Sequence, residues 1–183
     1  MVKWLRTSKS GMIVATIVRI YLAIAWLQAG WEKVVGFCTG KFSAAGFIQM
    51  GISHPVPVEG TSGPAEYPWY TWFLQHIAMP QVNVFSFMVA FGEVAVGLGL
   101  LFGTLTTAAA FFGMLMNWAY VLCGVVSSGP IDIICEFIIL VAGLNAGKIG
   151  LDRWIIPWLR SKIHWLGNSV FDEEKTTWPL QKA

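Results

Sequence analysis

A small set of charged and amide side chains interrupts stretches of this sequence that are otherwise almost entirely apolar. These residues are Arg19, Glu32, Lys33, Glu93, Asn117, Asp132 and Glu136. Such groups are costly in an apolar environment, and they therefore mark candidate functional positions. A carboxyl group there can accept and release protons, so we assign the catalytic role to Glu93 and Glu136. The other residues of the set are candidate substrate-binding groups.

Helical spacing places the polar residues of each apolar stretch on a face that they share with small residues. The shared faces are Arg19, Ala23, Trp26, Gly30 and Lys33; Tyr21, Gln28 and Glu32; Ser86, Glu93 and Gly97; Gly113, Asn117, Tyr120 and Gly124; and Asp132, Glu136 and Gly143. Small residues allow helices to approach closely, and polar residues avoid lipid by facing inward. This pattern predicts a compact helical bundle with a charged interior.

The depth of each residue along its helix indicates which polar groups should meet. A helix rises about 1.5 Å per residue. Arg19 comes eight residues after the expected inner boundary of its stretch, and Glu93 comes nine residues before that of its own. We therefore predict that Arg19 and Glu93 lie level and form an ion pair, with Asn117 beside them. A second, outer cluster is expected to consist of Glu32, Lys33, Asp132 and Glu136.

Two interpretations of these charges stay open. In the structural one, buried pairs fix the register of the helices and do nothing more. Such pairs are weak evidence for stability, because the cost of desolvation can exceed their attraction. In the functional one, the same groups line a polar pocket or a proton path within the bundle.

The composition places the apolar stretches in a membrane. Hydrophobic residues make up 56% of the 183 residues and charged residues only 12%, whereas a soluble domain carries about 25% charged residues. A soluble enzyme is thereby excluded, and the net charge of +2 does not suggest a nucleic-acid partner. We predict an all-α, polytopic four-helix bundle with spans over residues 11–35, 82–102, 106–126 and 131–146. Membrane lipid is then an expected partner.

The Lys and Arg residues predict the topology of these spans. They concentrate before the first span and after the fourth, whereas the long outer loop 37–80 contains only Lys41. Both termini should therefore be cytoplasmic in a protein of the plasma membrane. The expected organisation is a basic N-terminus over 1–10, a transmembrane domain over 11–160 and a cytoplasmic tail over 161–183. A cleaved signal peptide is the alternative for the first span, but Arg19 interrupts its apolar core.

The segments outside the spans are rich in aromatic residues. The outer loop contains an expected short helix over 42–50 and an aromatic run over 69–73, which is typical of a membrane interface. This loop could lie as a lid over the outer mouth of the bundle, or it could be a passive anchor. The stretch from Trp154 to Trp165 mixes aromatic with basic residues, and we expect it to be an interfacial segment.

The sequence does not predict a bound metal, haem or flavin. The histidines His54, His76 and His164 fall outside the spans, so haem ligation within the bundle is not expected. Cys123 and Cys135 flank the short third loop. They could form a disulfide on that side of the membrane, or they could be small buried residues.

Three segments of the sequence together resemble the DoxX family of membrane proteins. They are Arg19–Leu22 with Ala29–Lys33, the run Gly92–Gly103, and the run Asn145–Arg153. The long outer loop is similar to the DoxD-like branch, the small subunit of thiosulfate:quinone oxidoreductase. The resemblance implies a four-helix membrane protein tied to quinone or thiol redox chemistry. Carried over by position, it also implies polar helix positions at Lys33, Glu93 and Glu136.

The favoured hypothesis is that the chain is the membrane subunit of a quinone-linked oxidoreductase. It would bind an exchangeable quinone, take part in thiosulfate or thiol redox chemistry, and work with a second redox subunit. Arg19 or Lys33 would bind an anionic quinone or an oxyanion, while the two catalytic carboxyl groups would relay protons. Trp26 and Trp31 could stack on the quinone ring.

Two alternatives belong to other functional classes. One is a non-enzymatic membrane scaffold or assembly factor that holds a redox partner. The other is a small carrier for protons or solutes. Four helices are few for alternating access, so the carrier would need a homo-oligomer.

Overall fold

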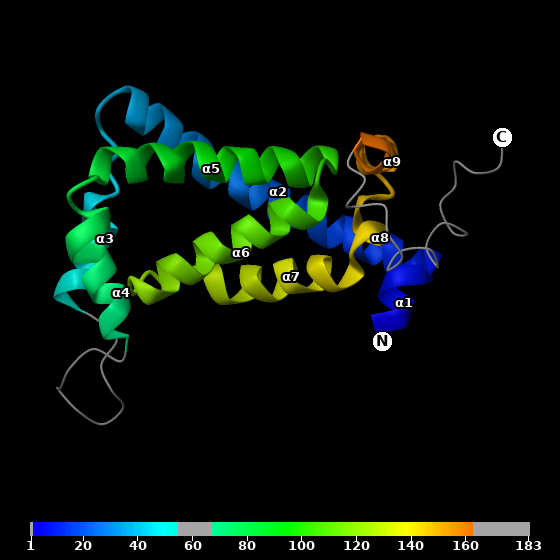
Figure 1. Cartoon of the computed structure of the whole chain (residues 1–183), viewed down its shortest axis with the longest axis horizontal. Helices are drawn as coiled ribbons and strands as arrows, with labels where there is room; N and C mark the ends of the chain where they lie inside the picture. The colour runs from blue at the N-terminus through cyan, green and yellow to red at the C-terminus, as the bar shows by residue number, and fades with distance from the viewer. Residues whose placement is uncertain (1, 55–66, 163–183) are drawn as a thin grey trace.

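In the computed structural model, residues 2–54 and 67–162 are described, and all regular secondary structure within these ranges is helical. The helices are α1 (Val2–Thr7), α2 (Lys9–Cys38), α3 (Ala45–Ser53), α4 (Pro68–Phe73), the π-helical turn η1 (Leu74–Ala78), α5 (Val82–Phe102), α6 (Thr106–Leu122), α7 (Gly129–Ala142), α8 (Leu144–Gly147) and α9 (Asp152–Lys162). The long helices α2, α5, α6 and α7 run along the molecule, with α3 and α4 at one end and α1, α8 and α9 at the other (Figure 1). We name these the α3/α4 end and the α1/α9 end. The all-α class predicted from the sequence is confirmed.

Helices α2 and α5 have the length and hydropathy of membrane-spanning segments, with 30 and 21 residues. They agree with the predicted spans 11–35 and 82–102. The apolar helix α6 is shorter, with 17 residues, and α7 has 14 residues. The helix predicted over 131–146 is interrupted, because Gly143 adopts a φ of 58° that ends α7. Glycine reaches this conformation without the steric cost that a side chain would add.

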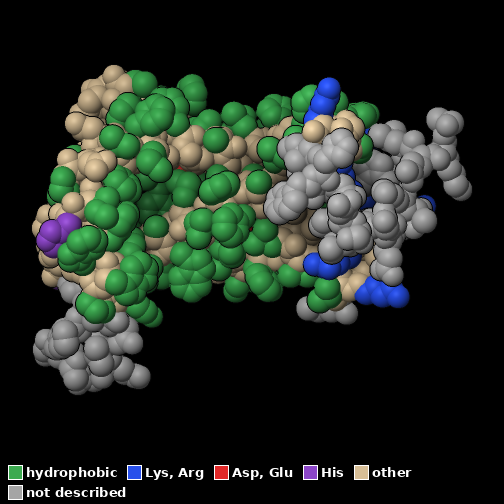
Figure 2. Space-filling model, viewed as in Figure 1, with side chains coloured by type: hydrophobic (Ala, Val, Ile, Leu, Met, Phe, Trp, Pro, Cys, Tyr) green, Lys and Arg blue, Asp and Glu red, His purple; other side chains and the backbone are tan. Residues whose placement is uncertain are grey.

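The flanks of the long helices are apolar. On the face shown in Figure 2, hydrophobic side chains cover the middle of the molecule, whereas Lys and Arg gather at the α1/α9 end. Ile17, Phe112 and Ile134 are among the large hydrophobic residues that are more than half exposed. An apolar flank with basic residues concentrated at one end is the pattern expected of helices in a lipid bilayer.

Helices α2 and α5 approach each other closely because glycines face the neighbouring helix. A Cβ atom on Gly30 would lie 2.9 Å from the Cβ of Glu93 and 2.8 Å from the backbone nitrogen of Val94. A Cβ atom on Gly97 would lie 2.7 Å from the side chain of Leu27. Small residues permit this approach of the two backbones. The contact also fixes the register of the pair and places Glu93 level with Gly30.

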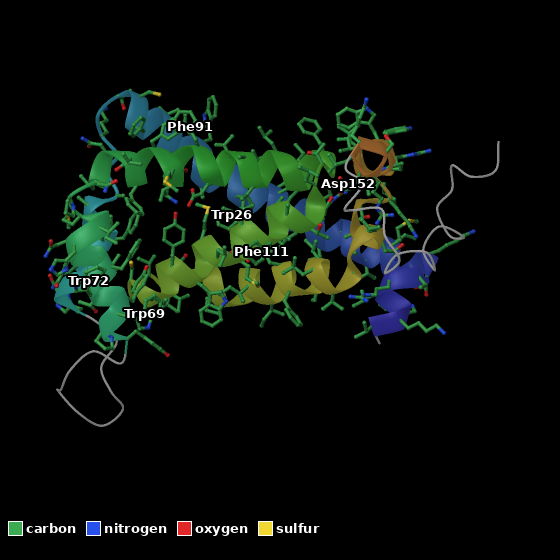
Figure 3. The ribbon with its side chains drawn as sticks, in the orientation of Figure 1. Trp26, Trp69, Trp72, Phe91, Phe111 and Asp152 are labelled. Carbon is green, nitrogen blue, oxygen red and sulfur yellow. The ribbon has the colours of Figure 1, made fainter. Side chains whose placement is uncertain are left out.

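The α1/α9 end is closed by hydrogen bonds between segments that are far apart in the sequence. The backbone nitrogens of residues 151–152 donate to the carbonyl oxygens of residues 102–103 at 3.0 and 2.7 Å. The carboxylate of Asp152 accepts from the backbone nitrogens of Leu105 at 2.5 Å and Thr106 at 2.9 Å. We name this set of contacts the clasp. Figure 3 shows Asp152 beside the turn that joins α5 to α6.

The clasp supplies the N-cap that α6 lacks in its own sequence. Leu105 precedes α6 with a φ of 49° and provides no side-chain hydrogen bond to the helix. Replacing Asp152 by Ala should therefore leave two backbone donors without a partner and lower the free energy of unfolding by about 1–2 kcal/mol. Thermal unfolding of the detergent-solubilised protein measures this loss. Asp152→Asn keeps one acceptor oxygen and should lose less, and an Ala variant as stable as the wild type would contradict the capping role.

Candidate functional site

An ion pair and a tyrosine hydroxyl meet in the interior between three of the long helices. The Nζ atom of Lys33 on α2 lies 2.5 Å from Oε1 of Glu93 on α5. The hydroxyl of Tyr120 on α6 donates to the same oxygen at 2.5 Å. The Lys33 ammonium also lies over the Tyr120 ring, 5.2 Å from its centroid. Because only 1% of the Glu93 side chain is exposed, its carboxylate depends on these two neighbours for compensation of its charge.

A second carboxyl group lies next to this arrangement. Glu136 on α7 is fully buried. Its Oε1 atom accepts from the Trp26 indole nitrogen at 3.0 Å and from the Asn117 side-chain nitrogen at 3.1 Å, and its Oε2 atom accepts from the same nitrogen of Asn117 at 3.1 Å. Figure 3 shows Trp26 projecting from α2 into the space between the long helices. The side chains of α2, α6 and α7 thus converge on one acidic group.

A cavity of about 340 Å³ connects these groups, and we name it the polar pocket. Its lining includes the side chains of Trp26, Ala29, Lys33, Phe47, Glu93, Asn117, Tyr120 and Asp132. Two buried oxygens of this lining, Oε2 of Glu93 and Oδ1 of Asp132, have no hydrogen-bond partner within residues 2–54 and 67–162. Buried acceptors are costly when unpaired, so the pocket is suited to a ligand that donates hydrogen bonds to them.

The charges around the polar pocket favour protons and hydrogen-bond donors over anions. Glu93 and Asp132 line the pocket, and Glu136 contacts two of its lining side chains. Lys33 is the cation within this lining. Acidic groups at such short range repel an anion and stabilise a shared proton or a donor group. The arrangement can therefore hold a small polar ring and exchange protons with it.

Aromatic residues of the outer segments pack against α6 at the α3/α4 end, and one of them, Phe47, lines the polar pocket. The ring of Phe47 on α3 packs edge to face on Tyr120, with 5.5 Å between centroids. The hydroxyl of Tyr70 on α4 donates to the Ala119 carbonyl oxygen at 2.9 Å and lies 3.4 Å from Sγ of Cys123. Burial raises the pKa of the Tyr70 hydroxyl, so this group stays a neutral donor. The segment that was expected to be either a lid or an anchor thus contributes at least Phe47 to the pocket lining.

The predicted ion pair between Arg19 and Glu93 is wrong. The Arg19 guanidinium donates instead to the carbonyl oxygens of Ala146 at 3.2 Å and Ile149 at 2.6 Å, at the α1/α9 end. Glu93 lies level with Gly30, eleven residues further along α2, which corresponds to roughly 16 Å. The error arises because α2 is nine residues longer than α5, so counting from the apolar ends does not align the two helices.

The other predicted site residues divide into two groups. The structure brings Trp26, Lys33, Glu93, Asn117, Asp132 and Glu136 together in or beside the polar pocket. Trp31 is 66% exposed, and Glu32 is also exposed on the flank of α2, away from that pocket. Of the expected outer cluster, Lys33, Asp132 and Glu136 lie in or beside the polar pocket, whereas Glu32 does not. Glu93 takes part in this cluster in addition.

The cysteines stay separate from this site chemistry. Cys38, Cys123 and Cys135 are all free thiols in the structure. Cys123 is buried in the small cluster with Ile48 and Leu74 at the α3/α4 end. The structure therefore agrees with the interpretation of Cys123 and Cys135 as small residues, and not with a disulfide between them.

Sequence reasoning missed two site residues. The spacing along the helix places Tyr120 on the same face as Asn117, but the set of candidate site residues does not include it. Phe47 carried no such signal, because it comes from an outer segment whose position over the bundle is set by tertiary packing. That packing includes a hydrogen bond from the backbone nitrogen of Ala44 to Oγ of Ser86 at 2.8 Å.

Comparison with known proteins assigns the chain to one family. The DoxX family profile matches residues 14–124, which is more than half of the chain and runs from α2 to the end of α6. The matched region contains Lys33, Glu93 and Tyr120, whereas Asp132 and Glu136 lie beyond it. Neither the comparison with curated proteins nor that with solved structures gives a match. The chain therefore belongs to the DoxX family and is a membrane protein.

Proposed function

We propose that this chain is the membrane subunit of a quinone-linked oxidoreductase and that its polar pocket binds the quinone head group. The observation that carries the proposal is the meeting of Lys33, Tyr120 and Glu93 beside two unpaired buried acceptor oxygens. A quinone ring is small, uncharged and able to accept two hydrogen bonds, and its reduced form donates two. The pocket offers donors and acceptors for both forms.

The proposed topology has α2, α5, α6 and α7 crossing the plasma membrane. Helices α6 and α7 would be about 26 and 21 Å long at 1.5 Å per residue, which is short for a hydrocarbon core of about 30 Å. The outer segments at the α3/α4 end and the residues after Gly143 would complete the thickness. Basic residues gather at the α1/α9 end, so this end would face the cytoplasm, with both termini on that side (Figure 2).

The lining side chains would have different roles in binding the quinone and in transferring its protons. When bound, a quinone takes up two electrons and two protons, and the electrons would come from a thiol or thiosulfate through a second redox subunit. Lys33 would donate one of its remaining ammonium hydrogens to a ring oxygen, while Tyr120, whose hydroxyl donates to Glu93, would contact the head group through its ring. Glu93 and Asp132 would accept and release the protons through their unpaired oxygens. Glu136 would exchange protons with them from behind the pocket.

The same geometry narrows the ligand class expected from the sequence. Arg19 is engaged with backbone carbonyls outside the pocket, and the pocket carries more carboxyl groups than cations. A neutral quinone is therefore a better ligand for it than an anionic quinone or an oxyanion. Aromatic contact would come from Phe47 and Tyr120, because Trp26 is hydrogen-bonded to Glu136 and Trp31 is exposed.

One surface feature favours a scaffold as the second candidate. Trp154 and Trp158 on α9 are 53% and 61% exposed, and Arg153 lies over the Trp154 ring at 4.5 Å. Such a basic aromatic helix would lie at a membrane interface or hold a partner subunit. Of the stretch that was expected to be interfacial, residues 154–162 belong to α9, and its remainder lies outside the described residues.

The test is mass spectrometry of the small molecules that the protein retains in mild detergent. The wild type should retain about one quinone per chain. Ala29→Leu should lose it, because Ala29 lines the polar pocket and the larger side chain would occupy the site of the ring. Ile24→Phe is the matched control, since Ile24 is half exposed on the same helix and outside the pocket. Retention of bulk lipid only, together with firmly bound protein partners, would contradict the quinone site and favour the scaffold.

A further inference from the structure

A second and larger cavity lies between α5 and α6, and we name it the apolar groove. Its volume is about 790 Å³, which is within the range of about 300–1,000 Å³ that small-molecule sites occupy. Small residues such as Ala95 on α5 and Ala108 on α6 form part of its walls. Leu98 and Phe112 also line it and are 41% and 57% exposed, so the groove opens on the flank of the molecule.

The groove exists because α5 and α6 diverge. The two helices touch near their connecting turn, where a Cβ atom on Gly99 would lie 2.9 Å from the Cβ of Ala109. From that turn they separate toward the α3/α4 end (Figure 1), and the surface is hollowed between them (Figure 2). Small residues normally let two helices close together. Beyond the turn, the small residues of α5 and α6 do not meet, and they leave the groove open between the two helices.

The apolar groove adjoins the polar pocket. Phe47 and Tyr120 line both cavities. The Tyr120 ring therefore forms part of the boundary between them, while its hydroxyl donates to Glu93 in the polar pocket. A polar site and an apolar site thus lie side by side, as a molecule with a polar ring and a hydrocarbon chain requires.

We propose that the apolar groove binds the isoprenoid tail of the quinone whose head group occupies the polar pocket, so that the site selects long-tailed quinones. This inference rests on the proposed function. The lining of the groove, among the described residues, contains no Asp, Glu, Lys, Arg or His, as a hydrocarbon tail requires. A phospholipid is a poorer occupant of the two cavities together, because a head group in the polar pocket would place its phosphate beside the carboxyl groups of Glu93 and Asp132.

The experiment compares the affinity for quinones that differ only in tail length, with the full-length protein in lipid nanodiscs. Ala95→Phe fills the groove, and Ala108→Phe fills it from the opposite wall if the first variant does not fold. Val84→Phe is the control, since Val84 is 52% exposed on α5 outside the groove. The affinity of each variant is divided by that of the wild type for a quinone of the same tail length. This ratio removes the contribution of quinone partitioning into the lipid.

We expect Ala95→Phe to weaken binding of a quinone with several isoprene units by about tenfold or more. Binding of the tail-free quinone should stay within about twofold of the wild type. Ala29→Leu, in the polar pocket, should weaken both. An equal effect of Ala95→Phe on both quinones, or no effect on either, would overturn the role of the groove while leaving the head-group site standing. Absence of quinone binding in the wild type, with phospholipid lost from Ala95→Phe, would overturn the proposed function and assign the groove to lipid.

Discussion

Replacing Glu93 by Gln is expected to lower quinone-dependent turnover by about a hundredfold or more, while the protein still folds and the new amide still accepts a hydrogen bond from Lys33. A glutamine has the shape of a glutamate, and its carbonyl oxygen can accept the hydrogen bonds from Lys33 and Tyr120 at the position of Oε1. It cannot take up a proton at the position of Oε2. Loss of a positioned acid or base costs about 10²–10⁴ in rate, so the chemical step should suffer more than binding. The measurement is quinone-dependent oxidation of a thiol or thiosulfate by membranes that contain this chain together with the proposed second redox subunit.

The matched control for this variant is Glu32→Gln. Glu32 lies on the same helix as Lys33, but it is exposed on the flank of α2 and does not line the polar pocket. Its replacement removes the same charge at a similar depth and should leave turnover unchanged. If Glu93→Gln turned over as fast as Glu32→Gln, Glu93 would have no part in proton transfer, and the buried ion pair would be structural.

Replacing Arg19 by Ala should cause the largest loss of stability, about 3–5 kcal/mol, and should leave quinone affinity in the folded fraction unchanged. The Arg19 side chain is 2% exposed, and its guanidinium donates to the carbonyl oxygens of Ala146 on α8 and Ile149 between α8 and α9. Asp152 attracts this charge, so its removal also leaves a buried carboxylate with less compensation. Thermal unfolding in detergent, with quinone binding measured below the transition, separates the two effects.

Arg19→Lys tests whether the fork of the guanidinium matters or only its charge. A lysine carries the charge but cannot reach two carbonyl groups in the same planar geometry, so we expect an intermediate loss of stability. An unchanged unfolding temperature for Arg19→Ala, together with lost quinone binding, would instead make Arg19 a ligand of the site. That result would favour the pairing that the sequence suggested over the one seen in the structure.

The contrast between Arg19 and Glu136 shows what spacing along a sequence can and cannot predict. Helical periodicity places each polar residue on a face, and both Glu93 and Glu136 face inward as that periodicity requires. Periodicity does not determine how far one helix is shifted along another. That offset depends on glycine contacts such as Gly30 against α5, and these involve the three-dimensional surfaces of both helices. The faces were therefore predictable, whereas the partner of Arg19 was not.

Asp152 caps a helix that begins 46 residues before it in the chain, and this separation has a consequence for biosynthesis. A ribosome delivers α5 and α6 to the membrane well before it makes Asp152. Until then, the backbone donors of Leu105 and Thr106 are without the acceptor that the finished protein gives them. The hairpin is thus completed by one of the last described helices. A nascent chain that stops before residue 152 should be recognised as unfinished by membrane proteases, although both of its longest helices have already been inserted.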